Sequence, residues 1–503
     1  MTTGERNDVL VIGNAALDAI EFSHRYLKIK RVELTNAPKH FDNAKAIIVA
    51  DAPGKFLLIK DCYSDVFLKA EDHGLAQVVL VHSNEDLRQV DALRKINYPN
   101  STSKIFLVNK TWKAAQFVAC HPFSPKVGNA TIDPPSITIS DDVKLLLRRA
   151  FSDCDYIFLK KISGGKASMA VYCVYARLPQ SIAGPRPLPF FVKIAEPSVI
   201  EEEKKKYHDY AENYIPFNLR PNLNHDRCVR TSTCAALVGN FVNDAIPLRQ
   251  CLRLGQGIGA LFSLFETSLK GFRLQPFAPG QGRRDDILPG FVKDRIRASE
   301  IAADVVDRAK RLGLLRAPAE LEDGLCQKAE KIPCLIGPCH GDLHSGNVMV
   351  RGGDAILIDF SSAGDGPLTA DPAALEVSLI FGTDEEDKAD TFDEWRMFTD
   401  HIYEGNVQSL RPPALSESKP GPYSWLRRSI RELRHILLGC EAGELEAKLI
   451  LAAYLMRYAR LGLEDLTNPS LEPLALDKHA YALVVAERIV AGLPDDIILK
   501  GSS

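Results

Sequence analysis

Apolar residues in the first 120 positions form short runs that alternate with amphipathic segments. Four strand-like runs lie at residues 8–14, 44–51, 77–83 and 104–110, and stretches such as EDLRQVDALRKI between them have helical periodicity. Continuous apolar runs of this length, bounded by helical segments, are typical of a parallel sheet covered on both faces. The pattern predicts a doubly wound α/β domain over residues 1–120.

The pattern changes after a proline-containing, helix-poor segment, HPFSPKVGNATIDPPSITIS, and we interpret residues 121–150 as a linker. Segments with strand-like patterns come next, and the charged stretch SVIEEEKKKYHDYAENYI, which has helical periodicity, follows them. After one more apolar run, the sequence has mostly helical periodicity to its end. Strands first and helices later predict an α+β unit with two lobes. Its strand-rich lobe is expected at residues 151–245 and its helical lobe at 246–503.

The composition of the chain argues against several kinds of binding partner and site. The chain has 503 residues with a formal net charge of −3 and 25% charged residues, which argues against binding nucleic acid or a membrane surface through bulk charge. No signal peptide and no run of about 18 apolar residues is evident, so a cytoplasmic location is expected. The 11 cysteines never occur as C-x-x-C, which indicates neither a disulfide framework nor a zinc knuckle.

Candidate chemistry gathers in CHGDLHSGNVMVRGGDAILIDF, residues 339–360. Two apolar runs flank RGGD, whose glycines suit the turn of a β-hairpin. Asp342 and Asn347 then lie on the loop that enters the hairpin, and Asp359 lies at its exit, so the three side chains can converge on one rim. Carboxylate and carboxamide oxygens in this arrangement suit Mg²⁺, which keeps several waters and bridges substrate phosphates.

Two other interpretations of this stretch remain open. Asp and Asn often serve only as capping and turn residues. A metal-dependent hydrolase would instead use His340 and His344 together with Asp342 as ligands, although Gly341 and the absence of helical context do not suit a helix-borne zinc site.

Two upstream segments add groups that suit a nucleotide. FLKKISGGKASMAVYCVYARL has the pattern strand, glycine-containing turn, strand, and the backbone N–H groups of its turn can cover phosphates. The turn residues are Gly164, Gly165, Lys166 and Ala167. PFFVKIAE then places Lys193 at the end of an apolar strand, where the lysine breaks the alternation and predicts an inward charge that needs a partner.

These motifs, in this order, resemble the protein-kinase-like superfamily, and HGDLHSGN is similar to its aminoglycoside phosphotransferase and choline kinase branch. The resemblance implies ATP (or GTP) and Mg²⁺ as cofactors, Asp342 as the general base or hydroxyl-orienting group, and Asn347 and Asp359 as metal ligands. It implies that Lys193 pairs with phosphates and that Glu203 is the partner of Lys193. His340 is then expected to brace the loop, and Lys204, Lys205 and Lys206 to lie on a solvated helix face.

Within the superfamily, residues 155–385 look most like the bacterial ternary-complex-associated domain 9 group. In that group an aspartate and a glutamate follow the metal motif, here Asp371 and Glu376, which we expect to brace the fold. The turn SGGKAS departs from G-x-G-x-x-G, and no H-R-D or A-P-E segment is present, so regulation through an activation loop is not expected. The resemblance does not imply an acceptor.

The strand ends of residues 1–120 resemble a response-regulator receiver domain. Asp51, Ser83 and Lys110 fall where that family has its phosphoacceptor, switch hydroxyl and lysine. The first strand ends in IGNAALD, where the family has two acidic Mg²⁺ ligands, so a degenerate receiver used for docking a protein partner is expected.

Together these features predict a phosphotransferase that moves the γ-phosphoryl group of a nucleotide to a hydroxyl of an unidentified acceptor, with the N-terminal domain as a docking or control module. The alternative is a pseudokinase scaffold that binds nucleotide without turnover in a bacterial signalling or defence complex.

Overall fold

A computed structural model describes the protein. It covers residues 9–12, 29–32, 37, 39, 44, 46–49, 66, 70, 75–80 and 105–108, and then residues 127–494 except 134–137, 163–168, 232–233, 278–286, 333, 385–386, 388–390, 404–409, 411–421, 441–442 and 463–467. The chain forms two compact units. One consists of residues 1–201 with 223–241, and the other of residues 202–222 with 242–503.

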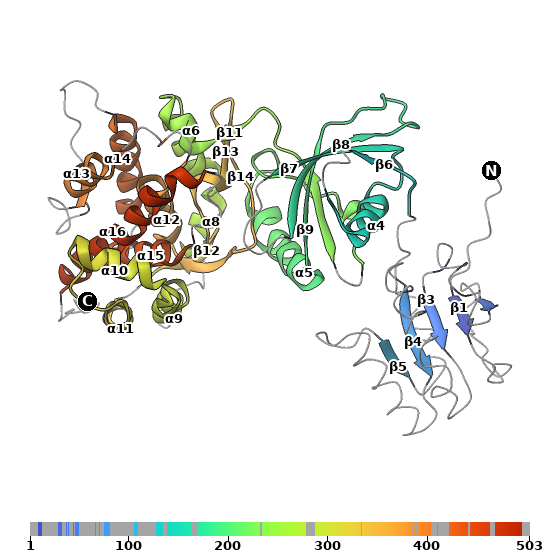
Figure 1. The fold of residues 1–503 in the computed structure, drawn as a ribbon, viewed down its shortest axis with the longest axis horizontal. Coiled ribbons are helices and arrows are strands. Elements are labelled where there is room, and N and C mark those ends of the chain that lie inside the picture. Colours follow the sequence, from blue (N-terminus) through green and yellow to red (C-terminus); the bar gives the residue numbers. More distant parts are fainter. Residues whose placement is uncertain are drawn as a thin grey trace. The chain divides into compact units, whose positions relative to one another are not determined.

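The N-terminal strands form one parallel sheet in the order β2-β1-β3-β4-β5 (Figure 1). Its strands are β1 (Val9–Ile12), β2 (Ile29–Val32), β3 (Ala46–Val49), β4 (Ala76–Leu80) and β5 (Ile105–Val108). All four predicted runs are confirmed as strands, and β2 was not predicted. The order is that of flavodoxin-like doubly wound sheets. Asp51, Ser83 and Lys110 lie outside the described residues, so the receiver resemblance stays a prediction.

A second five-stranded sheet, in the order β10-β9-β8-β7-β6, carries the strand-rich lobe. Its strands are β6 (Thr131–Asp133), β7 (Tyr156–Ile162), β8 (Ala170–Arg177), β9 (Phe190–Ala195) and β10 (Ala235–Asn240). β6 runs parallel to β7, and the remaining neighbours are antiparallel. The predicted strands of this lobe are therefore confirmed, and the edge strand β6 is an addition that was not predicted.

The helix α4 (Asp141–Ala150) covers one face of this sheet. The side chain of Ser140 accepts a hydrogen bond from the Val143 amide at 3.3 Å, which caps the helix. Leu146 and Leu147 are fully buried in the core that the sheet shares with α4. The prediction that residues 121–150 form a linker is therefore wrong for β6 and α4, because both belong to the folded sheet layer.

The second unit is mainly helical. Its helices are α6 (Leu248–Arg253), α7 (Ile258–Ser263), α8 (Lys270–Leu274), α9 (Ile287–Ile296), α10 (Ala303–Leu312), α11 (Pro318–Ala329), α12 (Ala370–Phe381), α13 (Phe392–Tyr403), α14 (Ser424–Leu438), α15 (Glu444–Arg460) and α16 (Glu472–Ala491). Most residues of α15 and α16 are buried, and these two helices lie side by side (Figure 1). A helix that is apolar on nearly every side belongs in a core. The predicted helical lobe is confirmed, because its helices make up most of this unit.

Two small antiparallel sheets interrupt the helices. One has the order β11-β13-β14, and the other pairs β12 with β15. The strands are β11 (Ile246–Pro247), β12 (Ile336–Cys339), β13 (Val348–Arg351), β14 (Asp354–Leu357) and β15 (Gly364–Pro367). The segment that the sequence singled out, residues 339–360, runs from β12 to just beyond β14.

A buried ion pair joins α12 to α14. The carboxylate of Glu376 accepts hydrogen bonds from Arg434 Nη2 at 2.9 Å and from Arg434 Nε at 3.3 Å, and the Tyr403 hydroxyl donates to it at 3.1 Å. Both side chains of the ion pair are 1% exposed. Glu376 therefore braces the helical unit, in agreement with its expected role.

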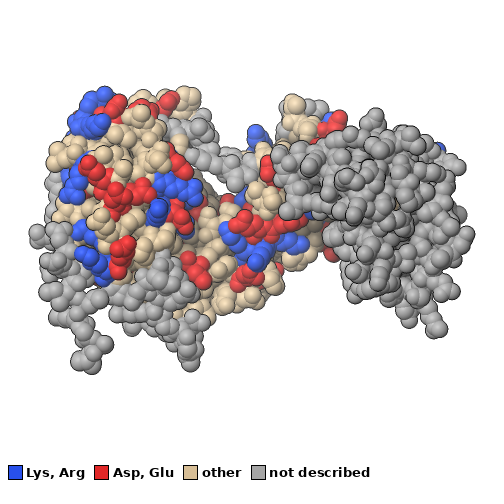
Figure 2. All heavy atoms as spheres, turned by 90° about the horizontal axis from the view of Figure 1, so that it is seen from below, with Lys and Arg blue, Asp and Glu red and all other residues tan. Residues whose placement is uncertain are grey.

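Basic and acidic side chains are interspersed over the described part of the face that Figure 2 shows. Such a surface carries no broad field of one sign. In the part of the chain that the structure describes, no helix is both long enough and apolar enough to cross a membrane.

Candidate active site

A tight hairpin supports the candidate site. β13 pairs with β14 up to Arg351 and Asp354, and Gly352 and Gly353 form the two-residue turn between them. These glycines have φ values of 61° and 93°. A turn that needs positive φ at both central residues favours glycine. The predicted hairpin is confirmed, and its turn lies at the end opposite Asn347 and Asp359.

Asn347 and Asp359 lie at the same rim of the hairpin. The amide of Ile358 donates to the Asn347 carbonyl at 3.0 Å, so the strand ladder continues one step beyond β13 and β14. Asp359 follows directly. The Asn347 side-chain nitrogen donates to the backbone carbonyl of Asp342 at 3.0 Å. This bond fixes the amide so that Oδ1 is the end left to accept or to bind a metal.

Asp359 has a left-handed backbone, with φ 59°. A non-glycine residue in this region costs about 1–3 kcal/mol, and such residues cluster at functional sites. The amide of Ser361 donates to Asp359 Oδ1 at 3.3 Å, which helps to hold the turn. The chain therefore bends sharply at the point where the carboxylate leaves the hairpin.

Asp371, at the start of α12, braces the loop that carries Asp342. Its carboxylate accepts hydrogen bonds from the backbone amides of His340 at 2.8 Å and Gly341 at 3.1 Å. Burial raises the pKa of Asp371, although His340 and the two amide bonds oppose the rise. His340 is fully buried, and its Nε2 lies 3.0 Å from the carbonyl oxygen of Ile358. His340 and Asp371 thus tie the loop to β14 and α12.

Gly341 allows this loop to pass close to the chain after β14. Its φ is 77°, and a Cβ added there would lie 2.2 Å from the carbonyl oxygen of Ser362. We expect Gly341→Ala to lower the free energy of unfolding by at least about 1–3 kcal/mol, from backbone strain alone. Urea denaturation checks this. Gly353→Ala is the matched control, because Gly353 also has positive φ but has nothing within 4 Å of an added Cβ. If the two variants lost the same free energy of unfolding, the contact with the Ser362 carbonyl would not explain the need for glycine at residue 341.

Asp342 faces a cation that the sequence did not reveal. Its Oδ1 lies 2.8 Å from Arg457 Nη2 of α15. Burial alone would raise the pKa of Asp342, but the charge of Arg457, with smaller effects of His344 and His340, holds the pKa below its ordinary value. Asp342 Oδ2 accepts no hydrogen bond from any described residue. The carboxylate is therefore ionised at neutral pH and keeps one oxygen for another partner.

The structure does not assemble the metal-dependent hydrolase site. His340 is buried with Nε2 against a carbonyl, whereas His344 is exposed and its Nδ1 accepts a hydrogen bond from the Gly346 amide at 3.1 Å. The described residues contain no group of three or more His, Cys, Asp or Glu side chains placed to hold a metal ion. The hydrolase interpretation is therefore wrong for His340, His344 and Asp342.

Residues 307–491 match the family model of ternary complex associated domain 9. The expected resemblance to this group is confirmed for these residues, which include Asp342, Asn347 and Asp359 together with most of the helices that follow. The match leaves out residues 155–306, where similarity was also expected, and it extends beyond residue 385 into the helical tail. A comparison with curated proteins finds no match.

Several solved structures are similar at low identity. A thermostable mutant of aminoglycoside phosphotransferase APH(4)-Ia is 14% identical, with 66% of this chain and 94% of that chain covered and a TM-score of 0.38. The gentamicin complex of APH(2")-IIa is 12% identical, with 69% and 97% covered and a TM-score of 0.39. Choline kinase from Cryptosporidium parvum Iowa II is 12% identical, with 67% and 88% covered and a TM-score of 0.34.

Lys193 and Glu203 lie outside the residues that match ternary complex associated domain 9. Lys193, in β9, is 8% exposed. Its neighbours on alternate positions, Phe191 and Ala195, pack with Ile200 of α5 (Pro197–Lys206), so Lys193 points to the sheet face that α5 covers. Glu203 is 4% exposed and follows Ile200 by about one helical turn. The inward charge on the strand is confirmed, and its ion pair with Glu203 stays a prediction.

Lys206 is not the solvated lysine that the sequence predicted. Its Nζ donates to the carbonyl oxygen of Ser361 at 2.8 Å and lies 2.9 Å from Glu202. The next residue, Tyr207, packs edge-on against Phe360, with ring centroids 5.7 Å apart. The end of α5 is thus tied to the segment that follows Asp359. The turn residues Gly164, Gly165, Lys166 and Ala167 lie outside the described residues.

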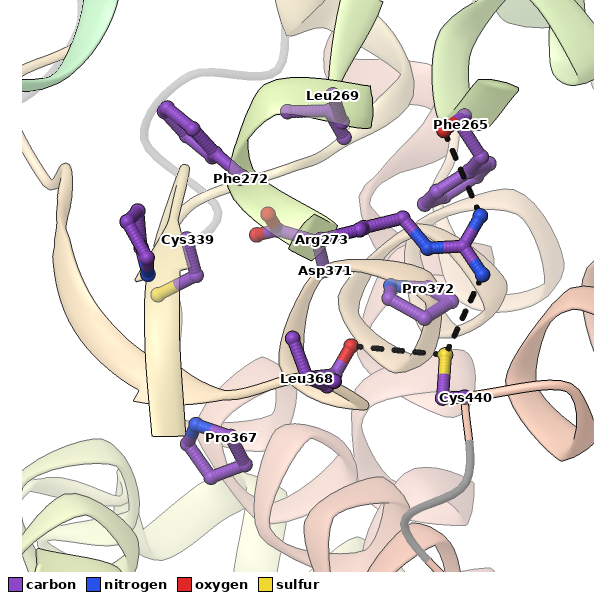
Figure 3. A pocket seen from close by; sticks show the side chains of 11 residues that line it. Phe265, Leu269, Phe272, Arg273, Cys339, Pro367, Leu368, Asp371, Pro372 and Cys440 are labelled. Carbon is purple, nitrogen blue, oxygen red and sulfur yellow. Dashed lines mark hydrogen bonds between the residues drawn. The ribbon is translucent and has the colours of Figure 1, made fainter. Parts of the chain in front are cut away.

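A small pocket lies between β12 and the start of α12 (Figure 3), and its empty volume of about 300 Å³ includes open solvent. It is lined mainly by apolar side chains, and Asp371 and Arg273 are its charged lining residues. Arg273 donates to the Phe265 carbonyl at 3.4 Å and contacts the Cys440 sulfur at 4.0 Å. None of Asp342, Asn347 and Asp359 lines this pocket.

Proposed function

We propose that the protein transfers the γ-phosphoryl group of ATP or GTP to a hydroxyl group of a small-molecule acceptor. The observation that supports this proposal is the hairpin that begins after Asn347 and ends before Asp359, with Asn347 bonded to the backbone of Asp342. The loop before it is held by Asp371 and His340. Phosphoryl transfer depends mainly on positioning and charge stabilisation, which such a rigid platform supplies.

The donor chemistry at this rim fits Mg²⁺. Asn347 Oδ1 and the Asp359 carboxylate would hold the ion, and two protein oxygens suit a metal that otherwise binds water and substrate phosphates. Bound Mg²⁺ would neutralise charge on the nucleotide phosphates. Thiolate or imidazole ligands, which zinc prefers, do not gather at the rim within the described residues.

Asp342 is the group that meets the acceptor. Its Oδ1 is occupied by Arg457, and Oδ2 is available to accept a hydrogen bond from the acceptor hydroxyl. As the new O–P bond forms, the hydroxyl proton passes to Asp342 Oδ2 and the nucleoside diphosphate leaves. The ion pair with Arg457 keeps the carboxylate charged and oriented before the transfer.

Lys193 and Glu203 would help to bind the nucleotide. A lysine buried on a strand needs an anionic partner, and a buried glutamate on the following helix together with nucleotide phosphates would provide one. Backbone amides of Gly164, Gly165 and Lys166 would cover the phosphates. Residues 1–120 would dock a protein partner or control the enzyme.

A scaffold that binds nucleotide without turnover is the second candidate. The observation that favours it is the Arg457 contact, because this contact occupies one oxygen of the proposed base. Such a protein would hold Mg²⁺ and nucleotide at the same rim but would not transfer the phosphoryl group.

ATP or GTP together with Mg²⁺ should raise the melting temperature of the full chain. A ligand that binds only the folded state stabilises it by about 2.7 kcal/mol at 100 times its Kd. Differential scanning fluorimetry measures the shift, with nucleotide plus EDTA as the control for the metal. The absence of any shift at millimolar nucleotide and Mg²⁺ would count against both the enzyme and the scaffold.

A further inference from the structure

A second arginine, Arg295 of α9, lies beside the loop that carries Asp342. A Cβ added to Gly341 would be 3.3 Å from Arg295 Nη2, which places this guanidinium next to the residue before Asp342. The guanidinium also stacks on the ring of Phe291, 4.6 Å from its centroid. No described carboxylate lies within ion-pair distance of Arg295, and its buried Nε has no hydrogen-bond partner among the described residues.

Arg457 also has more donors than the protein uses. Its only ion pair in the described chain is the single contact of Nη2 with Asp342, and its side chain is 18% exposed. The guanidinium lies 5.8 Å from the ring centroid of Tyr454, one turn earlier on α15. The buried hydroxyl of Tyr454 lies close to the Arg295 guanidinium.

The nearby carboxylates do not neutralise the positive charges of Arg295 and Arg457. Asp342 is shared with the proposed chemistry, and Asp371 is occupied by two backbone amides. Glu300 is held by Arg460 at 2.7 Å. Among the described residues, Arg295 and Arg457 thus share a single, partly engaged carboxylate, that of Asp342. A partly buried guanidinium is costly to leave unpaired, and its planar set of donors matches a carboxylate or phosphate group.

We propose that Arg295 and Arg457 bind an oxyanion, a carboxylate or a phosphate, that the acceptor carries. This inference rests on the proposed function, because it assigns the class of acceptor to the same site. The acceptor is then an alcohol with an anionic group close to its reacting hydroxyl. Arg457 holds Asp342 through Nη2 and offers Nε and Nη1 to the oxyanion, so the hydroxyl lies within reach of Asp342 Oδ2. A cationic aminosugar does not fit these charges.

Binding of inorganic phosphate to the full chain tests the site without a known acceptor. Isothermal titration calorimetry is run with saturating Mg²⁺ and a non-hydrolysable ATP analogue, and again without nucleotide. We expect Arg295→Gln and Arg457→Gln each to weaken phosphate binding by roughly tenfold or more. Malonate, titrated in the same way, distinguishes a site that prefers carboxylates from one that prefers phosphate.

Arg460→Gln is the matched control, since it removes the same charge from the same helix at a residue that already has its own partner, Glu300. It should leave the phosphate Kd unchanged. Equal phosphate affinity in Arg295→Gln, Arg457→Gln and Arg460→Gln would overturn the proposal, as would the absence of phosphate binding to the wild type at about 10 mM. Arg295→Lys keeps the charge and serves if Arg295→Gln does not fold.

A panel of alcohols separates this inference from the proposed function. The wild type is incubated with labelled ATP and with phosphorylated, carboxylated, neutral or cationic alcohols, and we expect transfer to an anionic one, with a raised KM in Arg295→Gln. Arginine-dependent phosphate binding without transfer to any alcohol would contradict the enzyme and leave the oxyanion site standing. Transfer to a neutral or cationic alcohol, with phosphate binding indifferent to both arginines, would contradict the oxyanion site and leave the enzyme standing.

Discussion

Replacing Asp342 with Asn should lower turnover by roughly 10²–10⁴-fold while nucleotide affinity changes little. The substitution keeps the size of the side chain and removes the charge that orients the acceptor hydroxyl and accepts its proton. It also removes the negative charge that pairs with Arg457 Nη2. Because no acceptor is known, the first assay is slow ATP hydrolysis or autophosphorylation, with nucleotide affinity measured separately by calorimetry.

Asp359→Asn should act differently, because it removes a charge from the proposed metal ligand and weakens binding of the Mg²⁺–nucleotide complex itself. Asp354→Asn is the matched control. Asp354 belongs to the same hairpin but is exposed beside its glycine turn, and its loss should affect neither measurement. If the wild type binds Mg²⁺–ATP but transfers no phosphoryl group to water, to itself or to any alcohol, the assignment of Asp342 fails and the scaffold takes its place.

Replacing Arg434 with Met should lower the free energy of unfolding by about 3–5 kcal/mol. The Glu376 carboxylate would remain in the core without its ion-pair partner, and of its described hydrogen bonds the one from the Tyr403 hydroxyl would be left. Breaking a buried pair from one side costs more than the pair contributes, since the remaining charge has lost its compensation. Urea unfolding followed by circular dichroism measures the loss.

The double variant with Glu376→Met should recover most of this stability, because two apolar side chains of similar volume leave no charge in the core. Arg428→Met is the control on the same helix, and its exposed position predicts a change within about 0.5 kcal/mol. A double variant as unstable as Arg434→Met alone would show that packing around Arg434, and not the isolated charge of Glu376, causes the loss.

The sequence revealed the parts of the site that are set by local patterns. Asp342, Asn347 and Asp359 fall within one short hairpin, whose glycine turn and apolar runs are visible in the chain. Arg457 and Arg295 were missed because each reaches the loop from a helix distant in sequence, and local periodicity carries no information about such pairing. The available signal for Arg457 was an arginine within the apolar stretch LILAAYLMRYA.

In the fold, too, the features with a local sequence pattern could be predicted and those that depend on distant contacts could not. The helix α4 could have been predicted, since Ser140 precedes two aspartates and an apolar stripe that ends in two arginines, which is a complete helix signature. The prolines before it led to the linker interpretation instead. β2 contains IKRV, where two basic residues hide the strand pattern. The tie between Lys206 and Ser361 depends on tertiary contact and has no local signature.

The path of the chain through its two compact units limits how the protein can be divided for expression. The polypeptide changes unit at residues 201/202, 222/223 and 241/242, so residues 202–222 belong with the helical unit although strands of the other unit precede and follow them. A fragment that starts at residue 242 would lack Lys206 and Tyr207, and with them the contacts to Ser361 and Phe360. Supplying residues 202–222 as a separate peptide should therefore restore order to the segment after Asp359 in such a fragment. Neither unit is a contiguous gene segment that can be cloned or exchanged alone.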